Sequence, residues 1–159
     1  KVALAKKDIK VVAINDLSSA EACAHLLKYD SVHGRFLEEV KVEKGTLQVL
    51  GHKIQVTSQI EIKELPWKKR GIDVVLECTG KFTSRDKVKG HLEAGAKKVI
   101  VSAPCKEDDL TVVMGINEDQ YDTNKHHILS NASSLFKEKM VSLGFNPADR
   151  KIFFAFIAF

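Results

Sequence analysis

The chain has 159 residues, three cysteines and a formal net charge of +4, from 25 basic and 21 acidic residues. This is a one-domain length, and fractions of 44% hydrophobic and 29% charged residues are those of a globular protein, which excludes a disordered chain. No run approaches the roughly 18 apolar residues that span a membrane. The lysines are scattered, and the one basic run, 68–70, has no interleaved aromatic residues. We therefore expect neither nucleic acid nor a membrane as a partner.

The cysteines, Cys23, Cys78 and Cys105, are odd in number, widely spaced and contain no C-x-x-C pair. This pattern argues against a disulfide framework and against a zinc site, and it fits a reducing compartment. The lysine-rich start also lacks the apolar segment of a secretory leader. We expect a cytoplasmic protein without a metal.

Apolar, β-branched runs alternate with helical patterns, which predicts an α/β fold with a parallel sheet flanked by helices. Residues 10–15 read as a buried strand, followed by a helix over 20–27 that Ser18 and Ser19 cap. Three short alternating runs, separated by Lys44-Gly45 and Gly51-His52, predict a small antiparallel meander inserted into this pattern. The remaining expected elements are the meander strands 40–43, 46–50 and 53–57, the strands 73–77, 98–102, 111–114 and 127–130, and a helix over 84–94 that Gly95 ends.

Asp16 directly follows the strand predicted at residues 10–15. In α/β dinucleotide-binding units, a carboxylate at the end of the second strand accepts hydrogen bonds from the adenine-ribose hydroxyls. Because it would repel a 2′-phosphate, such a carboxylate favours NAD over NADP. The alternative is an Asx-turn or a helix cap, the commoner role of an isolated aspartate after a strand.

Thr79 and Gly80 follow the strand predicted at 73–77, and Ser102 ends the strand predicted at 98–102. Open α/β sheets bind ligands at the carboxyl edge of their strands. A small hydroxyl and a glycine permit a close approach of a cofactor's phosphates or nicotinamide ribose. The alternative for Thr79-Gly80 is an ordinary strand-to-loop turn.

The glycine fingerprint of a dinucleotide-binding loop is missing, since none of the nine glycines forms a G-x-G string. That string should precede Asp16 by about 20 residues, a position before Lys1. We expect the chain to start inside the first helix, after the central strand and the phosphate loop. Two neighbouring strands would then have unpaired edges, and NAD binding would be weak.

Four strings point to a known family, and the pattern that they form covers about residues 1–134. The strings are Tyr29-Asp30-Ser31-Val32-His33-Gly34-Arg35, Glu77-Cys78-Thr79-Gly80, His91-Leu92-Glu93-Ala94-Gly95-Ala96-Lys97-Lys98-Val99-Ile100 and Ser130-Asn131-Ala132-Ser133-Ser134. Together they closely resemble phosphorylating glyceraldehyde-3-phosphate dehydrogenase. The resemblance implies an incomplete Rossmann-type NAD-binding domain at 1–134, with a small antiparallel insertion.

The resemblance also implies roles for individual residues. It places NAD against Asp16, Thr79, Gly80 and Ser102, and the substrate against Ser133. The family's reaction is the NAD-dependent oxidation and phosphorylation of D-glyceraldehyde 3-phosphate in glycolysis, by cytoplasmic homotetramers. A relative that oxidises erythrose 4-phosphate shares much of this segment. In one departure, Ile60-Glu61-Ile62 stands where the family has an Arg-Asp-Pro string on the adenine side, which puts adenine affinity in doubt.

The second departure is at the nucleophile, where the family's S-N-A-S string runs into a catalytic cysteine. This chain has Ser134 there, followed by Leu135. A serine hydroxyl attacks only when a neighbouring base activates it, and the family's base is a histidine of the downstream catalytic domain. We therefore expect Ser134 to occupy the catalytic position as a cap or turn residue, and the chain to be an inactive fragment.

From residue 135 the family pattern ends, so 135–159 is predicted to be a separate, non-family tail. Residues 135–143 fit a short amphipathic helix, and residues 152–159 hold four of the eight phenylalanines and no charge. This last segment fits a buried strand, a partner-binding segment or an aggregation-prone segment. The alternative function is thus a non-catalytic module that joins full-length subunits or other partners, and we expect self-association.

Overall fold

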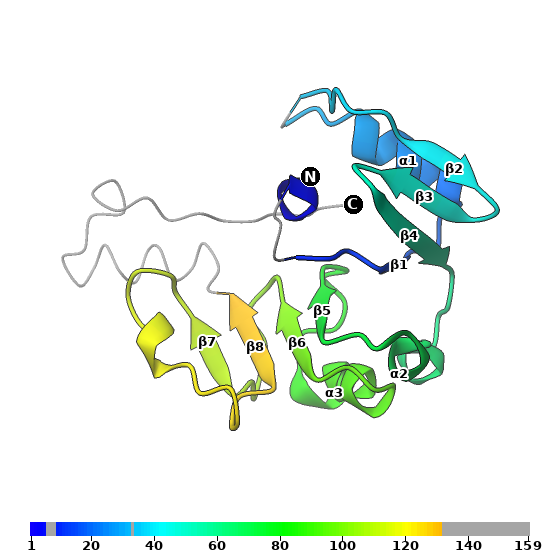
Figure 1. Cartoon of the computed structure of the whole chain (residues 1–159). Helices are drawn as coiled ribbons and strands as arrows, with labels where there is room; N and C mark the ends of the chain where they lie inside the picture. The colour runs from blue at the N-terminus through cyan, green and yellow to red at the C-terminus, as the bar shows by residue number, and fades with distance from the viewer. Residues whose placement is uncertain (6–8, 33, 132–159) are drawn as a thin grey trace. The chain divides into compact units, whose positions relative to one another are not determined.

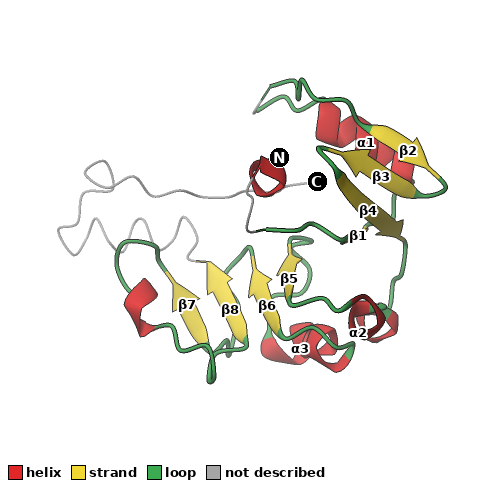
Figure 2. Cartoon of the chain, viewed as in Figure 1, coloured by secondary structure: helices red, strands yellow, loops and turns green. Residues whose placement is uncertain are grey.

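The computed structural model describes residues 1–5, 9–32 and 34–131. The chain divides into two compact units, Lys1–Glu64 and Leu65–Phe159 (Figures 1 and 2). One unit contains a mixed sheet and the other a parallel sheet, each with helices. The predicted α/β class, an incomplete Rossmann-type fold with an antiparallel insertion, is confirmed.

The first unit is built on a four-stranded sheet in the order β1-β4-β3-β2. Strand β1 is parallel to β4, whereas β2, β3 and β4 form the predicted antiparallel meander. The elements are η1 (Val2–Ala5), β1 (Ala13–Asn15), α1 (Ala20–Lys28), β2 (Lys41–Glu43), β3 (Thr46–Val49), β4 (His52–Thr57) and η2 (Ile62–Glu64).

Both turns of the meander have two residues with positive φ. These are Lys44 (48°) with Gly45 (72°), and Leu50 (47°) with Gly51 (77°). Two-residue turns of this conformation match the right-handed twist of the strands that they join. The prediction of the second turn at Gly51-His52 was wrong by one residue, because His52 pairs with Val49 and so already belongs to β4.

The core of the first unit lies between α1 and the sheet. The Ser19 hydroxyl caps α1 by accepting a hydrogen bond from Ala22 N at 3.2 Å. Cys23 and Leu27 of α1 are buried with Leu47 and Ile54 of the sheet. The spacing of Cys23 and Leu27, four residues apart, puts them on one helix face.

Strand β1 is shorter and more exposed than predicted. Its ladder begins at Ala13 rather than at residue 10, and its three residues are only half-buried. The reason is its place at the edge of the described sheet, where it pairs with β4 alone.

The second unit has a parallel sheet in the order β5-β6-β8-β7. Val88 of α3 packs on Val99, Val101 and Ile128 of the sheet, and all four are at most 2% exposed. The elements are α2 (Trp67–Arg70), β5 (Val74–Glu77), α3 (Arg85–Glu93), β6 (Lys98–Val101), β7 (Leu110–Val112), η3 (Glu118–Gln120) and β8 (Ile128–Asn131).

Two details of this unit bear on the sequence predictions. Helix α3 begins after Ser84 as its N-cap and is followed by Gly95 with a φ of 108°, as the stop signal predicted. The basic run 68–70 forms most of α2, whose first residue, Trp67, is buried.

Replacing Gly95 should destabilise the second unit more than replacing any open glycine. An alanine Cβ at position 95 would lie 2.4 Å from Lys68 Cβ and 2.7 Å from its Cα, at a φ that L-residues rarely adopt. We expect Gly95→Ala to lower the free energy of unfolding by about 3 kcal/mol, measured by urea denaturation. Gly71→Ala is the control, because Gly71 has a φ of 60° and nothing within 4 Å, and it should cost only about 1 kcal/mol. Equal losses would contradict the packing argument.

Candidate functional site

The carboxyl ends of β5 and β6 form one continuous edge of the parallel sheet. The two strands are direct neighbours, with Glu77 opposite Val101. Beyond their last paired residues, Ser102 N donates to the Glu77 carbonyl at 2.9 Å. The structure therefore brings the segment that holds Thr79 and Gly80 to the same edge as Ser102, which is where open α/β sheets bind ligands.

A short turn at Thr79 and Gly80 follows β5. The Thr79 N–H and hydroxyl both donate to Glu77 Oε1, at 2.8 Å and 2.5 Å, and Thr79 Oγ1 accepts from Lys81 N at 3.1 Å. Gly80 has a φ of 70° and open space on its Cβ side. The turn that was the alternative interpretation is present, and it exposes Thr79 and Gly80 to solvent.

Behind the turn lies a buried chain of hydrogen bonds that sequence reasoning missed. Glu77 Oε2 is 3.0 Å from His91 Nε2, and Trp67 Nε1 donates to His91 Nδ1 at 3.1 Å. Glu77 and His91 are each 4% exposed and Trp67 is 5% exposed. Burial acts to raise the pKa of Glu77, but the hydrogen bonds from His91 and Thr79 outweigh it, so the pKa lies below its ordinary value.

One sequence signal could have revealed this chain. Glu77 alternates with Val75 along β5, so the strand period puts both side chains on the same face, and Val75 is buried. A carboxylate on a buried face needs hydrogen-bond donors. His91 on α3 and Thr79 in the following turn are those donors, and the single tryptophan, Trp67, donates to His91.

None of the three cysteines is activated as a nucleophile. Burial raises the pKa of Cys78, a hydrogen bond with Ser102 lowers it in part, and the charge of Glu77 raises it further. The pKa values of Cys23 and Cys105 are also raised, in both cases mainly by burial and further by a nearby aspartate. Thiolate chemistry at neutral pH is therefore not a property of these residues.

Asp16, the fourth predicted cofactor residue, belongs to the first unit and follows β1. Its N–H donates to the Thr57 carbonyl at 2.9 Å, and its Oδ1 accepts from Ser18 N at 2.7 Å. This is the Asx-turn that was the alternative to ribose binding. Among the described residues, Oδ2 has no hydrogen-bond partner, so the turn leaves one carboxylate oxygen available to a ligand.

Asn15, which the sequence analysis did not single out, fixes the backbone before Asp16. Its Oδ1 accepts from Gln59 N at 2.9 Å and from Thr57 Oγ1 at 3.0 Å, and its Nδ2 donates to the Gln59 carbonyl at 3.0 Å. These bonds join the carboxyl ends of β1 and β4. Asparagine is common in turns, so its type alone did not predict this role.

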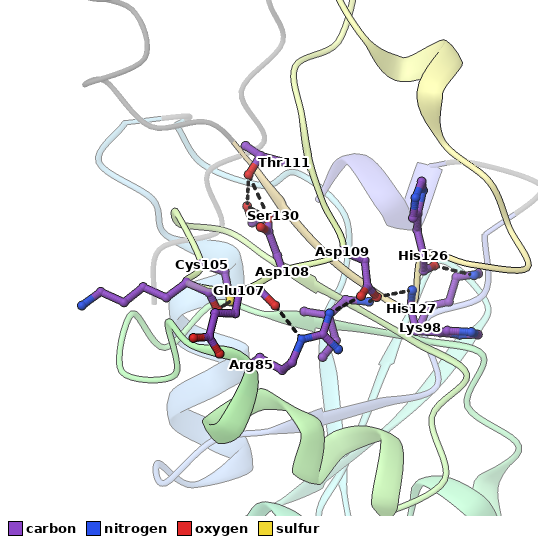
Figure 3. Close-up of polar contacts among 12 residues, drawn as sticks. Arg85, Lys98, Cys105, Glu107, Asp108, Asp109, Thr111, His126, His127 and Ser130 are labelled. Atoms are coloured by element: carbon purple, nitrogen blue, oxygen red, sulfur yellow. Dashed lines mark hydrogen bonds and ion pairs between the residues drawn. The ribbon is translucent and has the colours of Figure 1, made fainter.

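A second polar network, drawn in Figure 3, fixes the start of β8. The Asp109 carboxylate pairs with Arg85, and its Oδ2 accepts from the backbone N–H groups of His127 and Ile128, both at 2.7 Å. Burial acts to raise the pKa of Asp109, but the hydrogen bonds from Ile128, Arg85 and His127 outweigh it and lower the pKa. The network thus fixes the strand that leads towards Ser133 and Ser134.

The same figure shows Ser130 beside a carboxylate. Asp108 Oδ2 accepts from the hydroxyls of Ser130 and Thr111, at 2.5 Å and 2.8 Å, which links β8 to β7. Ser130 is 0% exposed, so no substrate can reach it and the pairing is structural. The predicted residues Ser133 and Ser134 lie outside the described residues.

The described part of the chain contains neither a metal-binding group nor a membrane-spanning helix. It contains no group of three or more His, Cys, Asp or Glu side chains that could hold a metal ion. Within the same residues, no helix combines the length and the apolar character that crossing a membrane requires.

Comparison with known proteins identifies the family. The family described as "Glyceraldehyde 3-phosphate dehydrogenase, NAD binding domain" matches residues 1–85, just over half of the chain. The chain belongs to this family. Asp16, Thr79 and Gly80 lie within the matched residues, whereas Ser102 lies outside them. The predicted resemblance is confirmed, and with it NAD as the cofactor of the family's domain.

Several relatives are similar over most of this chain. Glyceraldehyde-3-phosphate dehydrogenase of Geobacillus stearothermophilus is 53% identical over 133 residues, which is 84% of this chain and 40% of the relative. Glyceraldehyde-3-phosphate dehydrogenase 2 of Bacillus subtilis (strain 168) is 52% identical over 131 residues, 82% of this chain and 38% of the relative. Glyceraldehyde-3-phosphate dehydrogenase of Xanthobacter flavus is 56% identical over 128 residues, 80% of this chain and 38% of the relative. The chain thus spans about two-fifths of the length of these relatives.

Stability should fall in acid partly through Glu77. Because its folded pKa is lowered, its contribution is present above the unfolded pKa of about 4.3 and is lost as the pH falls through the folded pKa. Glu77→Gln forces an amide N–H against a donor, so it should cost about 1–3 kcal/mol at pH 7 and less at pH 3.5. Urea denaturation at pH 7, 5 and 3.5 measures this difference.

The control for this prediction is Glu107→Gln. Glu107 is exposed in the same unit, and it accepts a hydrogen bond from Arg85 through its backbone carbonyl, which the substitution keeps. That variant should change stability by less than about 0.5 kcal/mol at any of these pH values. A loss in Glu77→Gln that does not depend on pH would contradict the assignment of Glu77 as a buried carboxylate.

Proposed function

We propose that the chain binds NAD, with residues 1–134 as the cofactor domain and residues 135–159 as a tail outside the family pattern. The observation that carries this proposal is the grouping of Thr79, Gly80 and Ser102 at the carboxyl edge of β5 and β6. Membership in the family of NAD-binding domains supports it. The small, exposed turn at Thr79 and Gly80 suits a close approach of the cofactor's phosphate or ribose.

Asp16 is proposed to bind the adenine ribose. Its Oδ1 already accepts from Ser18 N, which fixes the direction of the carboxylate, and its Oδ2 is available to accept from a ribose hydroxyl. The negative charge would repel a 2′-phosphate, so we propose NAD rather than NADP as the cofactor. This role combines the Asx-turn and the ribose interpretation, which use different oxygens of one side chain.

The proposed parent reaction is the oxidation and phosphorylation of D-glyceraldehyde 3-phosphate, with Ser133 at the substrate. We propose that the chain itself does not catalyse it, because Ser134 stands at the nucleophile position. A serine hydroxyl needs a base.

A second candidate function is non-catalytic association with full-length subunits or with other copies. The observation that favours it is the edge strand β5, which pairs with β6 alone among the described strands. Its Val74 and Leu76 side chains are 46% and 52% exposed, on the face opposite Val75. An exposed apolar edge strand is a template for pairing with another chain. A monomer in light scattering at high concentration would exclude self-association.

NAD should bind this chain weakly and with a preference over NADP. The 159 residues contain no G-x-G string for the pyrophosphate, so we expect a dissociation constant near the millimolar range. Asp16→Asn keeps the Oδ1 acceptor of the turn but removes the charge. It should therefore reduce the ratio of the NADP dissociation constant to the NAD dissociation constant about tenfold. Amide chemical shifts in an NMR titration with each cofactor measure both constants.

Glu38→Gln is the matched control for the NAD titration, because Glu38 is an exposed acid of the same unit. It should leave the NAD and NADP constants unchanged. A micromolar constant for NAD that is lost in Asp16→Ala would show a competent site built without the glycine string. Equal affinity for NAD and NADP in the unmodified chain would contradict the role of Asp16.

The purified chain should form no NADH from glyceraldehyde 3-phosphate, NAD and phosphate. The physical reason is that an unactivated hydroxyl at Ser134 does not attack the aldehyde, whereas the family uses a thiolate there. Absorbance at the NADH band, followed over hours at high protein concentration, measures this. NADH formation that Ser134→Ala abolishes would overturn the proposal of inactivity.

A further inference from the structure

The three side chains of Trp67, His91 and Glu77 form a buried line that ends at the exposed turn. They come from three different elements, α2, α3 and β5. Each of the three residues is at most 5% exposed, so their hydrogen bonds are made with one another and not with bulk water. The Thr79 N–H and hydroxyl form the far end of the line. The Glu77 carboxylate is therefore the group that connects the buried residues to the exposed turn at Thr79.

The donors and acceptors along this line allow only one arrangement. The indole N–H of Trp67 can only donate, so His91 Nδ1, 3.1 Å away, must be unprotonated and accept. The imidazole then carries its proton on Nε2 and donates to Glu77 Oε2 at 3.0 Å. Glu77 Oε1 accepts twice from Thr79, so both oxygens of Glu77 act as acceptors and the group is a carboxylate.

We propose that Trp67 and His91 are positioning residues for the cofactor turn. By holding His91 as the neutral Nε2–H tautomer, Trp67 keeps one oxygen of Glu77 occupied from the interior. The other oxygen then faces Thr79 and fixes the backbone of Thr79 and the left-handed conformation of Gly80. This inference rests on the proposed NAD site at Thr79, Gly80 and Ser102, and assigns the residues that preorganise it.

A merely structural core would not depend on the direction of these hydrogen bonds. In Glu77→Gln the amide must turn its NH₂ group towards either His91 Nε2–H or Thr79, and each choice sets donor against donor. Removing the indole N–H with Trp67→Phe frees His91 Nδ1 to take the proton. His91 Nε2 can then accept from the amide that Glu77→Gln introduces, so the second substitution relieves the conflict that the first one creates.

The first experiment is a double-mutant cycle on the full chain. We expect Glu77→Gln and Trp67→Phe each to raise the equilibrium constant for unfolding. The double variant should be at least fivefold less destabilised than the product of the single effects, because the tautomer switches. Additive effects, or a double variant worse than additive, would overturn the inference. Glu107→Gln combined with Trp67→Phe is the control and should show additivity.

The second experiment reads the tautomer directly by ¹⁵N NMR of the His91 ring at pH 7. The unmodified chain should show a protonated Nε2 and an unprotonated Nδ1, and the double variant Trp67→Phe with Glu77→Gln should show the reverse. A doubly protonated ring or an Nδ1–H tautomer in the unmodified chain would overturn the inference. The measurement on the unmodified chain needs no variant, so it decides the tautomer on which the inference depends even if the variants do not fold.

The third experiment tests the effect on the turn and on the cofactor. The Thr79 amide should exchange with water about tenfold faster in Glu77→Gln than in the unmodified chain, because the new amide either turns its NH₂ group towards the Thr79 N–H or keeps its oxygen there only with a donor–donor conflict at His91. Thr79→Ser keeps the hydroxyl that donates to Glu77 and accepts from Lys81 N, and should retain NAD affinity. Thr79→Val should weaken it about tenfold. Unchanged exchange in Glu77→Gln would overturn the inference.

The cofactor readout separates this inference from the proposed function. If NAD does not shift the amide signals of Thr79 and Gly80 in the unmodified chain, the proposed NAD site fails. The His91 tautomer and the Thr79 exchange rate then still decide whether the buried line fixes the turn. If NAD binds with equal affinity to the unmodified chain and to Glu77→Gln, the turn is fixed without consequence for the cofactor, and the inference is wrong.

Discussion

The arrangement of the second unit depends on a carboxylate that is buried at the end of a strand. A buried carboxylate without partners is strongly destabilising, so the elements around Glu77 must supply donors from both sides. His91 on α3 supplies one and Thr79 in the following turn supplies two. Trp67 on α2 in turn fixes His91. One charge thereby connects two helices, a strand and an exposed turn, and any change in its protonation affects all of them.

The first unit reaches a similar result without a charge. Asn15 is the last residue of β1, as Glu77 is the last residue of β5. The polar side-chain atoms of each residue form hydrogen bonds with the segment beyond its strand. Asn15 bonds to Thr57 at the end of β4 and to Gln59 beyond it. The amide suffices there because the site is half-buried. At both strand ends, the hydrogen bonds of a polar side chain hold the segment that follows the last paired residue of the strand.

Family membership and the chemistry of this chain point in different directions. The match to the NAD-binding domain covers residues 1–85, and relatives near 50% identity extend the similarity to about 130 residues. We propose that Ser134 stands at the position of the family's nucleophilic thiol, and the three cysteines of the chain have raised pKa values. Under this proposal, the cofactor half of the family's function and its catalytic half are separable in this sequence.

The sequence alone determined the α/β class, the meander and the carboxyl-edge position of Thr79, because these depend on local periodicity and on glycine signals. It also identified the family through short strings. It did not determine the buried hydrogen bonds that lead to Glu77, since Trp67 donates to His91, which lies 24 residues further along the chain, and the two meet only when α2 and α3 pack. The tautomer of His91 is likewise a property of the folded chain, because it depends on which group faces each ring nitrogen. Side-chain direction across packed elements is tertiary information, and no pattern along one element carries it.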